Sequence, residues 1–404
     1  MFCLLYAWGV YNIPILAVGV RHLRRSRGRD SGARVDVGNL PSFSIVVPVK
    51  DEEKVIDRLV GSLLRVDYPR EKFEIVLVED GSADETYGIC ADYVERFPSE
   101  VRLLRRPVSD GKPSALNYAL RHVRGEIVAV FDADSVPSSD ILRRAAEHFA
   151  ASSVAAVQGR LCSINGQESM LSKFISYEES VRYGTYLNGK DVLNLFVPLT
   201  GSCYFVRRSV LNAVGGWDGG SLSEDTELSA RLVEAGHKIR YASDLRSWQE
   251  NPSSLGQLFR QRARWFRGCM EVSMKYGKLL RKVNRQCIDV EITLFGPFVF
   301  VLLLLSYLFG LFGLMGWVQL DPFLTLFAEG TVLLATVTLL LIGIGLVYVS
   351  RPRRLRSLLW LPFIYGYWSF QSFIALFALF EIVFRRPRRW VKTVKTGTVT
   401  DGAF

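Results

Sequence analysis

The sequence has few of the residues that hold disulfide frameworks or zinc ions. Six cysteines and four histidines are spread over 404 residues, and no two cysteines form a CxxC pair. Paired cysteine spacings are the usual sign of zinc sites and of disulfide-rich secreted domains. Their absence argues against both classes and favours a reducing cytosol. The sequence also lacks internal repeats and low-complexity tracts.

The sequence does contain three long apolar stretches, at residues 4–20, 292–349 and 358–384. Because about 20 apolar residues span a bilayer as a helix, these stretches predict a membrane protein with a globular part between them. The first stretch lacks a basic n-region and an evident cleavage site. We therefore expect an anchor there rather than a removed signal peptide.

The formal net charge of +10 is concentrated in arginines next to these stretches. Five arginines lie within residues 21–29, four within 351–356 and four within 385–389. They could be solvated linker charge, but basic residues beside apolar segments are typical of cytoplasmic retention and of contact with anionic lipid. Nucleic acid is a poor partner, because no base-stacking motif accompanies the arginines.

Short apolar runs alternate with helical patterns after residue 42. We expect strands at 43–49, 73–78, 101–104 and 126–131, and helices at 53–64, 82–97 and 112–123. This alternation predicts an α/β fold with a parallel, Rossmann-like sheet. The segments 172–186 and 255–280 mix aromatic and charged residues at helical spacing, which predicts amphipathic helices at the membrane surface.

Carboxylates follow the ends of the expected strands, where open α/β folds bind their ligands. Asp132 and Asp134 are expected to project to one side of an extended segment. Two carboxylates placed in this way predict Mg²⁺ or Mn²⁺ bound to a diphosphate, and the alternative is an Asx turn. Asp80 is expected to accept a hydrogen bond from a base or ribose, to cap the next helix, or to do both.

Two further motifs carry possible chemistry. Lys112 follows Gly111 at the start of an expected helix, which suits a phosphate-side loop, although a solvated lysine at a helix start would look the same. Glu224 and Asp225 begin an expected helix at 226–235. One of these carboxylates could remove a proton from an acceptor hydroxyl, or both could complement the helix dipole.

The run Gln261-Arg262-Ala263-Arg264-Trp265 is the most specific motif. Residues three apart on a helix are neighbours, so Arg262 should lie near Trp265 and Gln261 near Arg264. Guanidinium groups recognise diphosphate oxygens, and an indole face can stack on a sugar. An ordinary amphipathic membrane helix is the alternative.

With these motifs, nearly the whole chain resembles the family 2 glycosyltransferases, in particular the membrane-integrated branch that includes cellulose, chitin, hyaluronan and poly-N-acetylglucosamine synthases. Residues 47–53 are similar to the opening motif of that family, with Asp51 in place of the common asparagine, and Glu79 replaces its usual first aspartate. Residues 200–203 resemble its acceptor-side loop, and residues 390–395 resemble a mobile lid. The resemblance implies a GT-A (Rossmann-like) glycosyltransferase domain with interfacial and transmembrane helices.

The resemblance also implies roles for single residues. The implied nucleotide or donor contacts are Pro48, Lys50, Glu52, Asp80, Lys112, Asp132, Gln261 and Arg264, and the implied acceptor contacts are Thr200, Gly201, Ser202 and Trp265. Asp134 would bind the metal, Asp225 would be the catalytic base with Glu224 beside it, and Trp390, Thr393 and Lys395 would belong to the lid.

The implied reaction is a single displacement that inverts the anomeric carbon, with Mg²⁺ or Mn²⁺ as cofactor and a nucleotide sugar, by resemblance a UDP-sugar, as donor. The expected product is a growing polysaccharide, with or without export. The alternatives are transfer of one sugar to a lipid, as by ceramide glucosyltransferase, and a non-catalytic carbohydrate-binding protein. The sequence leaves the transferred sugar and the oligomeric state open.

The implied domain order places the catalytic part in the cytosol, in a multi-pass protein of the cell membrane. The expected parts are an anchor at 1–20, a basic linker at 21–42, the catalytic domain at 43–250, an interfacial region at 251–287, a transmembrane or re-entrant region at 288–384 and a cytosolic tail at 385–404. If the catalytic domain and the tail share one side, the crossings between them must be even in number. Segment 358–384 is therefore expected to be re-entrant, and then able to line a channel, or interfacial.

Overall fold

The computed structural model describes residues 1–25, 40–282, 284–317, 321–349, 355–388 and 392–400. The chain divides into two compact units. One, here called the helical unit, comprises Met1–Arg29, Tyr177–Phe196 and Leu255–Val391. The other, the sheet unit, comprises Asp30–Ser176, Val197–Ser254 and Lys392–Phe404. The C-terminal tail therefore belongs to the same unit as the sheet.

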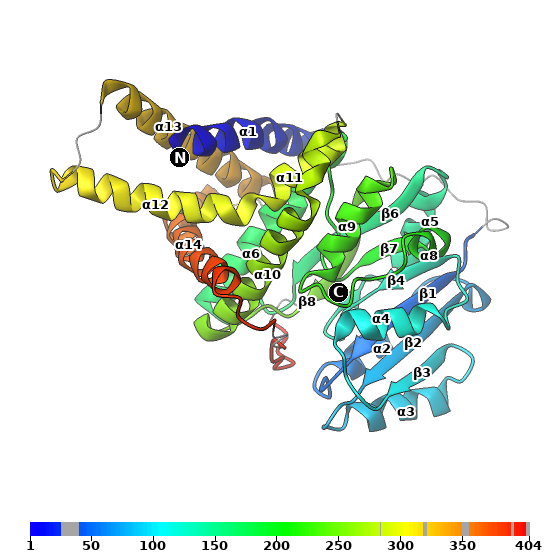
Figure 1. Ribbon diagram of the computed structural model, residues 1–404. Helices are drawn as coiled ribbons and strands as arrows, with labels where there is room; N and C mark the ends of the chain where they lie inside the picture. The colour runs from blue at the N-terminus through cyan, green and yellow to red at the C-terminus, as the bar shows by residue number, and fades with distance from the viewer. Residues whose placement is uncertain (26–39, 283, 318–320, 350–354, 389–391, 401–404) are drawn as a thin grey trace. The chain divides into compact units, whose positions relative to one another are not determined.

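A mixed sheet forms the centre of the sheet unit, with eight strands among the described residues in the order β3-β2-β1-β4-β7-β6-β8-β5 (Figure 1). The strands are β1 (Phe43–Val49), β2 (Phe73–Asp80), β3 (Val101–Arg106), β4 (Ile127–Val130), β5 (Val136–Pro137), β6 (Val154–Ser163), β7 (Tyr204–Arg207) and β8 (Lys238–Gln249). The first four strands pair in parallel, as the alternating pattern predicts. β7 runs antiparallel to both β4 and β6.

The central strands are formed by continuous runs of buried apolar residues. Ile45, Val46 and Val47 of β1 are almost fully inaccessible to solvent, as expected of a parallel strand covered on both faces. The helices of this unit are α2 (Ile56–Leu63), α3 (Thr86–Arg96), α4 (Lys112–Leu120), α5 (Ile141–Phe149), α8 (Arg208–Ala213) and α9 (Glu224–Glu234), with a 3₁₀ turn, η2 (Arg70–Lys72). Because β1, β2 and β4 are parallel, the residues that follow them lie at one edge of the sheet.

The helical unit contains the apolar helices. Its elements are α1 (Phe2–Arg25), the end of α6 (Met170–Val181), the π-helix η3 (Arg182–Tyr186), α7 (Leu187–Val192), α10 (Leu255–Tyr276), η4 (Gly277–Arg281), α11 (Arg285–Leu294), α12 (Gly296–Leu314), α13 (Pro322–Val349), η5 (Leu355–Trp360) and α14 (Leu361–Val383). Among the described residues, four segments are long and apolar enough to cross a membrane: Phe2–Arg24, Gly296–Gly313, Pro322–Val347 and Leu358–Val383.

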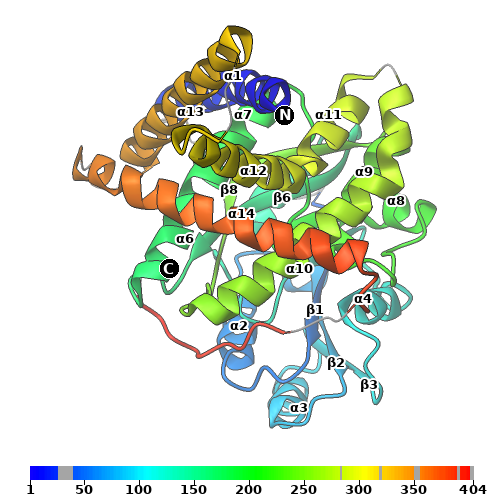
Figure 2. The same cartoon turned by 60° about the vertical axis from the view of Figure 1, so that its left-hand side comes forward.

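Within segment 358–384, helix α14 is continuous. It runs alongside α10 and also contacts α12 (Figure 2). Ala263, Phe266 and Met270 of α10 form a buried apolar cluster with residues of α14, including Ile374 and Ala378. The amphipathic helix α10 therefore packs its apolar face on α14.

Helix α1 packs against α13 and η3 and crosses α7 closely. A Cβ atom on Gly19 would lie 2.1 Å from the Thr185 carbonyl oxygen, and one on Gly189 would lie 2.0 Å from the Ile15 carbonyl oxygen. Only glycine allows backbones to approach this far. Beside the crossing, the Tyr11 hydroxyl of α1 donates a hydrogen bond of 2.5 Å to Asp289.

Asp289 is the centre of a buried polar cluster in the helical unit. Its carboxylate lies 2.9 Å from the Lys190 ammonium and also accepts the Phe196 N–H at 2.7 Å. Lys190 is fully buried, and burial lowers its pKa below the ordinary value despite the neighbouring carboxylate. Each charge of this pair is therefore satisfied inside the protein, as a buried ion pair requires.

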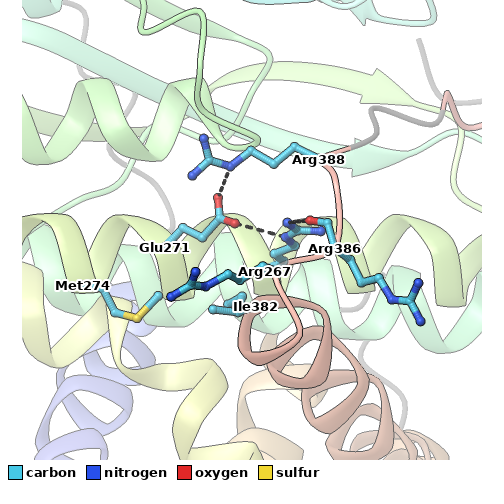
Figure 3. A pocket seen from close by; sticks show the side chains of 7 residues that line it. Arg267, Glu271, Met274, Ile382, Arg386 and Arg388 are labelled. Atoms are coloured by element: carbon cyan, nitrogen blue, oxygen red, sulfur yellow. Dashed lines mark hydrogen bonds and ion pairs between the residues drawn. The ribbon is translucent and has the colours of Figure 1, made fainter.

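A basic pocket of about 520 Å³ lies where α14 ends beside α10 (Figure 3). Its lining residues are Arg267, Glu271, Met274, Ile382, Arg385, Arg386 and Arg388. Arg267 donates to Glu271 at 3.0 Å and to the Arg386 carbonyl oxygen at 2.6 Å, and Arg388 lies 2.9 Å from Glu271. Arg267 thus ties α10 to the chain that leaves α14.

Candidate active site

Lys112 is the centre of a charged cluster at the edge of the sheet. Its ammonium lies 2.6 Å from Asp132 and 3.5 Å from Glu224, and it donates a hydrogen bond of 2.8 Å to the Gly201 carbonyl oxygen. Burial alone would lower the pKa of Lys112, but the two carboxylates raise it above its ordinary value. The predicted phosphate-side lysine is therefore a buried, charged group between predicted donor and catalytic residues.

Gly201 brings the predicted acceptor loop against Asp225. A Cβ atom on Gly201 would lie 3.4 Å from the Asp225 Oδ2 atom and 3.8 Å from the Lys112 ammonium, and the φ of Gly201 is +79°. Asp225 also accepts the Thr226 N–H at 2.7 Å. Glycine suits this left-handed backbone, and its lack of a side chain allows the loop to approach Asp225 and Lys112 closely.

Ser202 and Thr200 fix the rest of this loop. The Ser202 hydroxyl accepts the Asp132 N–H at 3.0 Å, and Thr200 donates its N–H to the Gln158 side chain at 2.8 Å. Asp132 itself lies in the turn after β4 rather than on an extended segment. The expectation that Asp132 and Asp134 project together from an extended strand is therefore wrong, because the chain turns here.

Asp134 is buried, unlike the half-buried Asp132. Its Oδ2 atom accepts the Glu250 N–H at 2.9 Å and lies 2.6 Å from the Lys395 ammonium of the tail. Burial would raise the pKa of Asp134, but Lys395 and the N–H donors hold it below its ordinary value. Asp134 is therefore an anionic carboxylate that faces a cation.

The donor set around Asp134 fits a hard divalent cation. Mg²⁺ and Mn²⁺ prefer oxygen ligands, and in nucleotide sites they take one or two carboxylates while phosphate oxygens complete the shell. Among the described residues, no group of three Asp, Glu, His or Cys side chains could hold a metal. A metal at this site would therefore depend on Asp134 together with oxygens of a bound nucleotide.

Asp80 has two partners that the sequence does not predict. Its carboxylate lies 2.8 Å from Arg106 of β3 and accepts a hydrogen bond of 2.6 Å from the Ser109 hydroxyl. The register of β2 with β3, which pairs Asp80 with Arg106, brings them together. A base or ribose at Asp80 would therefore meet a carboxylate that is already oriented, and Asp80 makes no side-chain cap of α3.

The opening motif lies beside the tail. Pro48 pairs with Val78 near the end of β1, and the carbonyl oxygen of Lys50 accepts a hydrogen bond of 2.9 Å from Lys392. Glu52 lies 3.1 Å from the Lys392 ammonium. Burial raises the pKa of Glu52 to about 7, even though Lys392 acts in the opposite direction.

Gln261, Arg264 and Trp265 lie on α10 in the helical unit, half-buried. The predicted neighbours Arg262 and Trp265 are in contact, with the guanidinium carbon 4.7 Å from the ring centroid. Arg262 is buried, lies 2.8 Å from Glu178 of α6, and shares that carboxylate with the Tyr367 hydroxyl of α14. Arg262 therefore fixes α10 to α6 and α14.

Sequence reasoning missed Glu250, Arg106 and Ser109. Glu250 could have been found by the rule that found the other carboxylates, because it directly follows a strand, β8. Of the residues predicted for the lid, Lys395 lies 2.6 Å from Asp134. Thr393 lies in the sequence between Lys395 and Lys392, which contacts Glu52. Trp390 lies outside the described residues.

Comparison with known proteins identifies the family and the fold of this chain. The family model described as "Glycosyltransferase like family 2" matches residues 41–268, more than half of the chain. The chain is 28% identical over 295 residues to the probable glycosyltransferase YdaM of Bacillus subtilis, which covers 72% of this chain and 70% of that protein. It is 30% identical to the beta-monoglucosyldiacylglycerol synthase of Trichormus variabilis, over 68% of this chain and 57% of that protein.

A poly-beta-1,6-N-acetyl-D-glucosamine synthase of Staphylococcus epidermidis is 27% identical, over 58% of this chain and 56% of that protein. Among solved structures, mannosyltransferase PcManGT from Pyrobaculum calidifontis, in complex with GDP-Man and Mn²⁺, matches with a TM-score of 0.62. That match covers 96% of this chain and 99% of the other at 18% identity, and it bears on the fold alone. The chain belongs to glycosyltransferase family 2, and it is a glycosyltransferase with the GT-A fold.

Proposed function

We propose that this chain transfers a sugar from a nucleotide sugar, with UDP as the expected nucleotide, to an acceptor at the membrane with inversion of the anomeric carbon. One observation carries the proposal. Lys112 bonds to Asp132 and Gly201 and lies near Glu224, so predicted donor, acceptor and catalytic residues from four separate segments form one contact cluster. Groups gathered in this way are what positioning two substrates requires.

Asp225 would take the proton of the acceptor hydroxyl, since its carboxylate lies beside Gly201 of the predicted acceptor loop. Lys112, with its raised pKa, would offset negative charge on the departing nucleoside diphosphate. A divalent cation held by Asp134 would, when bound, supply further stabilisation of that charge.

The expected acceptor is a growing polysaccharide, and transfer of one sugar to a lipid is the second candidate. The relative from Staphylococcus epidermidis is named for a polysaccharide. The relative from Trichormus variabilis is named for a glucosyl lipid and shares a higher identity over a larger part of this chain, which supports the second candidate. The size of the product distinguishes the two.

For the membrane topology, we propose that α12 and α13 cross the bilayer and that α14 lies at its cytosolic surface. The tail and the carboxylate cluster belong to one unit, so the chain between them must cross an even number of times. Helix α10 has four arginines within residues 260–267, which excludes it from the hydrocarbon core. Since α14 packs along α10 from Phe370 to Glu381, we place it at the same depth.

The pocket at the end of α14 supports this placement. Arg385 and Arg386 line it, and the neighbouring Val383 and Phe384 are exposed. Apolar side chains beside arginines suit the level of lipid headgroups, where cations meet phosphate. We propose that this end of α14 contacts anionic lipid.

The decisive experiment supplies purified full-length protein with radiolabelled nucleotide sugars, Mn²⁺ and native lipid, and measures the amount and size of the product. Asp225→Asn keeps the shape of the side chain and should lower turnover by ~10²–10⁴ while UDP binding stays within about threefold. Asp92→Asn, at an exposed site on α3, is the matched control and should keep full activity. Turnover of Asp225→Asn within about tenfold of the wild type would refute the assignment of the base.

A further inference from the structure

The tail is docked on the sheet unit by contacts along most of its described length. At its start, Lys392 donates to the carbonyl oxygens of Lys50 and Asp51 and lies 3.1 Å from Glu52. At its end, Thr400 donates its N–H to the Ile164 carbonyl oxygen at 3.0 Å. These contacts hold the middle of the tail in register with the site.

Lys395, in the middle of the tail, makes two polar contacts there. Its ammonium lies 2.6 Å from the Asp134 Oδ2 atom and donates a hydrogen bond of 2.8 Å to the Glu250 carbonyl oxygen. The two side chains are well shielded, with 15% of Lys395 and 5% of Asp134 exposed. Lys395 is therefore a cation on the carboxylate that is assigned to the metal.

Glu250 receives the next two residues of the tail. Its Oε1 atom accepts the N–H of Thr396 at 2.6 Å and the Thr396 hydroxyl at 2.9 Å, and its Oε2 atom accepts the Gly397 N–H at 3.0 Å. Gly397 has a φ of +81° and would bring a Cβ atom to 3.1 Å from the Lys54 carbonyl oxygen, so the turn requires glycine. The Glu250 carboxylate thus has a donor on each oxygen.

Glu250 joins the tail to Asp134 through both its backbone and its side chain. Its N–H donates to Asp134 Oδ2, its carbonyl oxygen accepts from Lys395, and its side chain holds the residues that follow Lys395. The Oδ2 atom already has two donors, and a metal ion needs a lone pair of a carboxylate oxygen at about 2.0–2.2 Å. A divalent cation at that oxygen would also repel the ammonium.

We propose that Glu250 is a positioning residue that holds the tail over the site, and that Lys395 and the divalent cation occupy Asp134 in alternation. This inference rests on the proposed function, because it takes Asp134 as the metal ligand. In the absence of metal the tail covers the site with its own cation. Binding of the metal releases Lys395 and loosens the hold on residues 396 and 397. Metal binding therefore weakens tail docking, and tail docking weakens metal binding to the same extent.

The first test measures the affinity of purified full-length protein for Mn²⁺ by calorimetry, at a saturating UDP concentration that supplies the nucleotide oxygens. Lys395→Met removes the competing ammonium and should lower the Kd by roughly tenfold or more, the factor expected for one charge-assisted hydrogen bond. Lys54→Met removes the same charge from an exposed neighbouring position and should change the Kd by less than about twofold. An equal Kd for Lys395→Met and wild type would overturn the alternation.

The second test follows the tail itself by hydrogen exchange of the peptide that contains residues 396 and 397. In the wild type with saturating UDP, addition of saturating Mn²⁺ should accelerate exchange at these two amides by roughly tenfold. Glu250→Gln offers one acceptor oxygen where the tail donors need two, so its tail should exchange quickly with or without Mn²⁺. Exchange that is unchanged or slowed by Mn²⁺ in the wild type would show that tail and metal bind together, which contradicts the proposal.

Asp134→Ala separates the failure of this inference from that of the proposed function. If its Kd for Mn²⁺ equals that of the wild type, the metal assignment and the alternation both fail. If Asp134→Ala loses Mn²⁺ while Lys395→Met binds it no more tightly than the wild type, the metal assignment stands and the alternation alone is wrong.

Discussion

The Arg262 guanidinium lies over the ring of Trp265, 4.7 Å from its centroid. A ring has two faces, and Arg262 covers one, so at most one face of this indole is available to a sugar. The same guanidinium is bound to Glu178, which fixes the orientation of the covered face. If Trp265 is the platform for the accepting sugar, the sugar must therefore stack on the face that Arg262 does not cover.

Trp265→Ala should lower transfer by at least about tenfold, because it removes the surface on which the accepting sugar stacks. UDP affinity should stay within about threefold, since Gln261 and Arg264 remain. A polymerase should also release shorter chains, whereas a lipid glycosyltransferase should make the same product more slowly. Turnover and product size are the measurements.

Arg262→Met provides the contrast to that variant. It leaves the half-buried Glu178 carboxylate without its cation and should cost roughly 1–3 kcal/mol of stability. Thermal unfolding in detergent distinguishes the two effects, because Trp265→Ala should unfold near the wild-type temperature. Full activity of a stable Trp265→Ala protein would exclude the platform.

Lys112→Met should lower nucleotide affinity by roughly tenfold or more, because in the proposed function this charge offsets that of the diphosphate. It also leaves Asp132 and Glu224 close together without a cation between them. Lys112→Arg keeps the charge and should recover part of the loss. Calorimetry with UDP checks this, and equal affinity in all three proteins would remove Lys112 from the donor site.

Glu52→Gln should stabilise the protein more at pH 8 than at pH 5. Burial raises the pKa of Glu52 from 4.5 to about 7, so folding favours its protonated form. The wild type therefore loses stability as the pH rises from about 4.5 to about 7. The loss is at most about 3 kcal/mol, since each pKa unit corresponds to about 1.4 kcal/mol.

Melting temperatures of both proteins at the two pH values check this sign. Glu53→Gln, at the exposed next position, should show no such difference. A larger gain at pH 5 than at pH 8 would mean that Glu52 is stabilised in its charged form. In that case Glu52 would be an ordinary partner of Lys392.

Single cysteines at Trp317, Arg356 and Arg386, in a protein without its native cysteines, should test the topology. If α12 and α13 cross and α14 lies at the surface, a membrane-impermeant reagent should reach the first site from one side and the other two from the opposite side. Trp317 lies between α12 and α13 and is 70% exposed. If the cysteines introduced at Arg356 and Arg386 were labelled from opposite sides, α14 would be a third crossing.

The features that could be predicted are those that depend on residues close together in the sequence. Buried runs such as 43–49 identify parallel strands, and the carboxylates at 80, 132 and 134 follow because strand ends in such sheets are binding edges. The sequence pattern also placed Lys112 at the start of a helix. Each of these predictions needs only neighbouring residues.

What could not be predicted depends on pairing between distant segments. Asp80 meets Arg106 only because β2 and β3 adopt one register, and Asp134 meets Glu250 across 116 residues of chain. The turn after β4 gives Asp132 and Asp134 different partners, which a two-residue period does not reveal. No local pattern indicates that Lys395 would reach the same carboxylate from the end of the chain.

The crossing of α1 with α7 has a consequence for the first helix of the chain. A membrane anchor can be exchanged for any apolar helix of the right length, but α1 meets its neighbours through Gly19 and through the Tyr11 hydroxyl on Asp289. An unrelated apolar helix would bring a side chain into the Thr185 backbone and leave Asp289 one donor short. The first helix is thus fixed to the helical unit by particular residues, and at those positions its sequence is not free to drift as that of a tether would be.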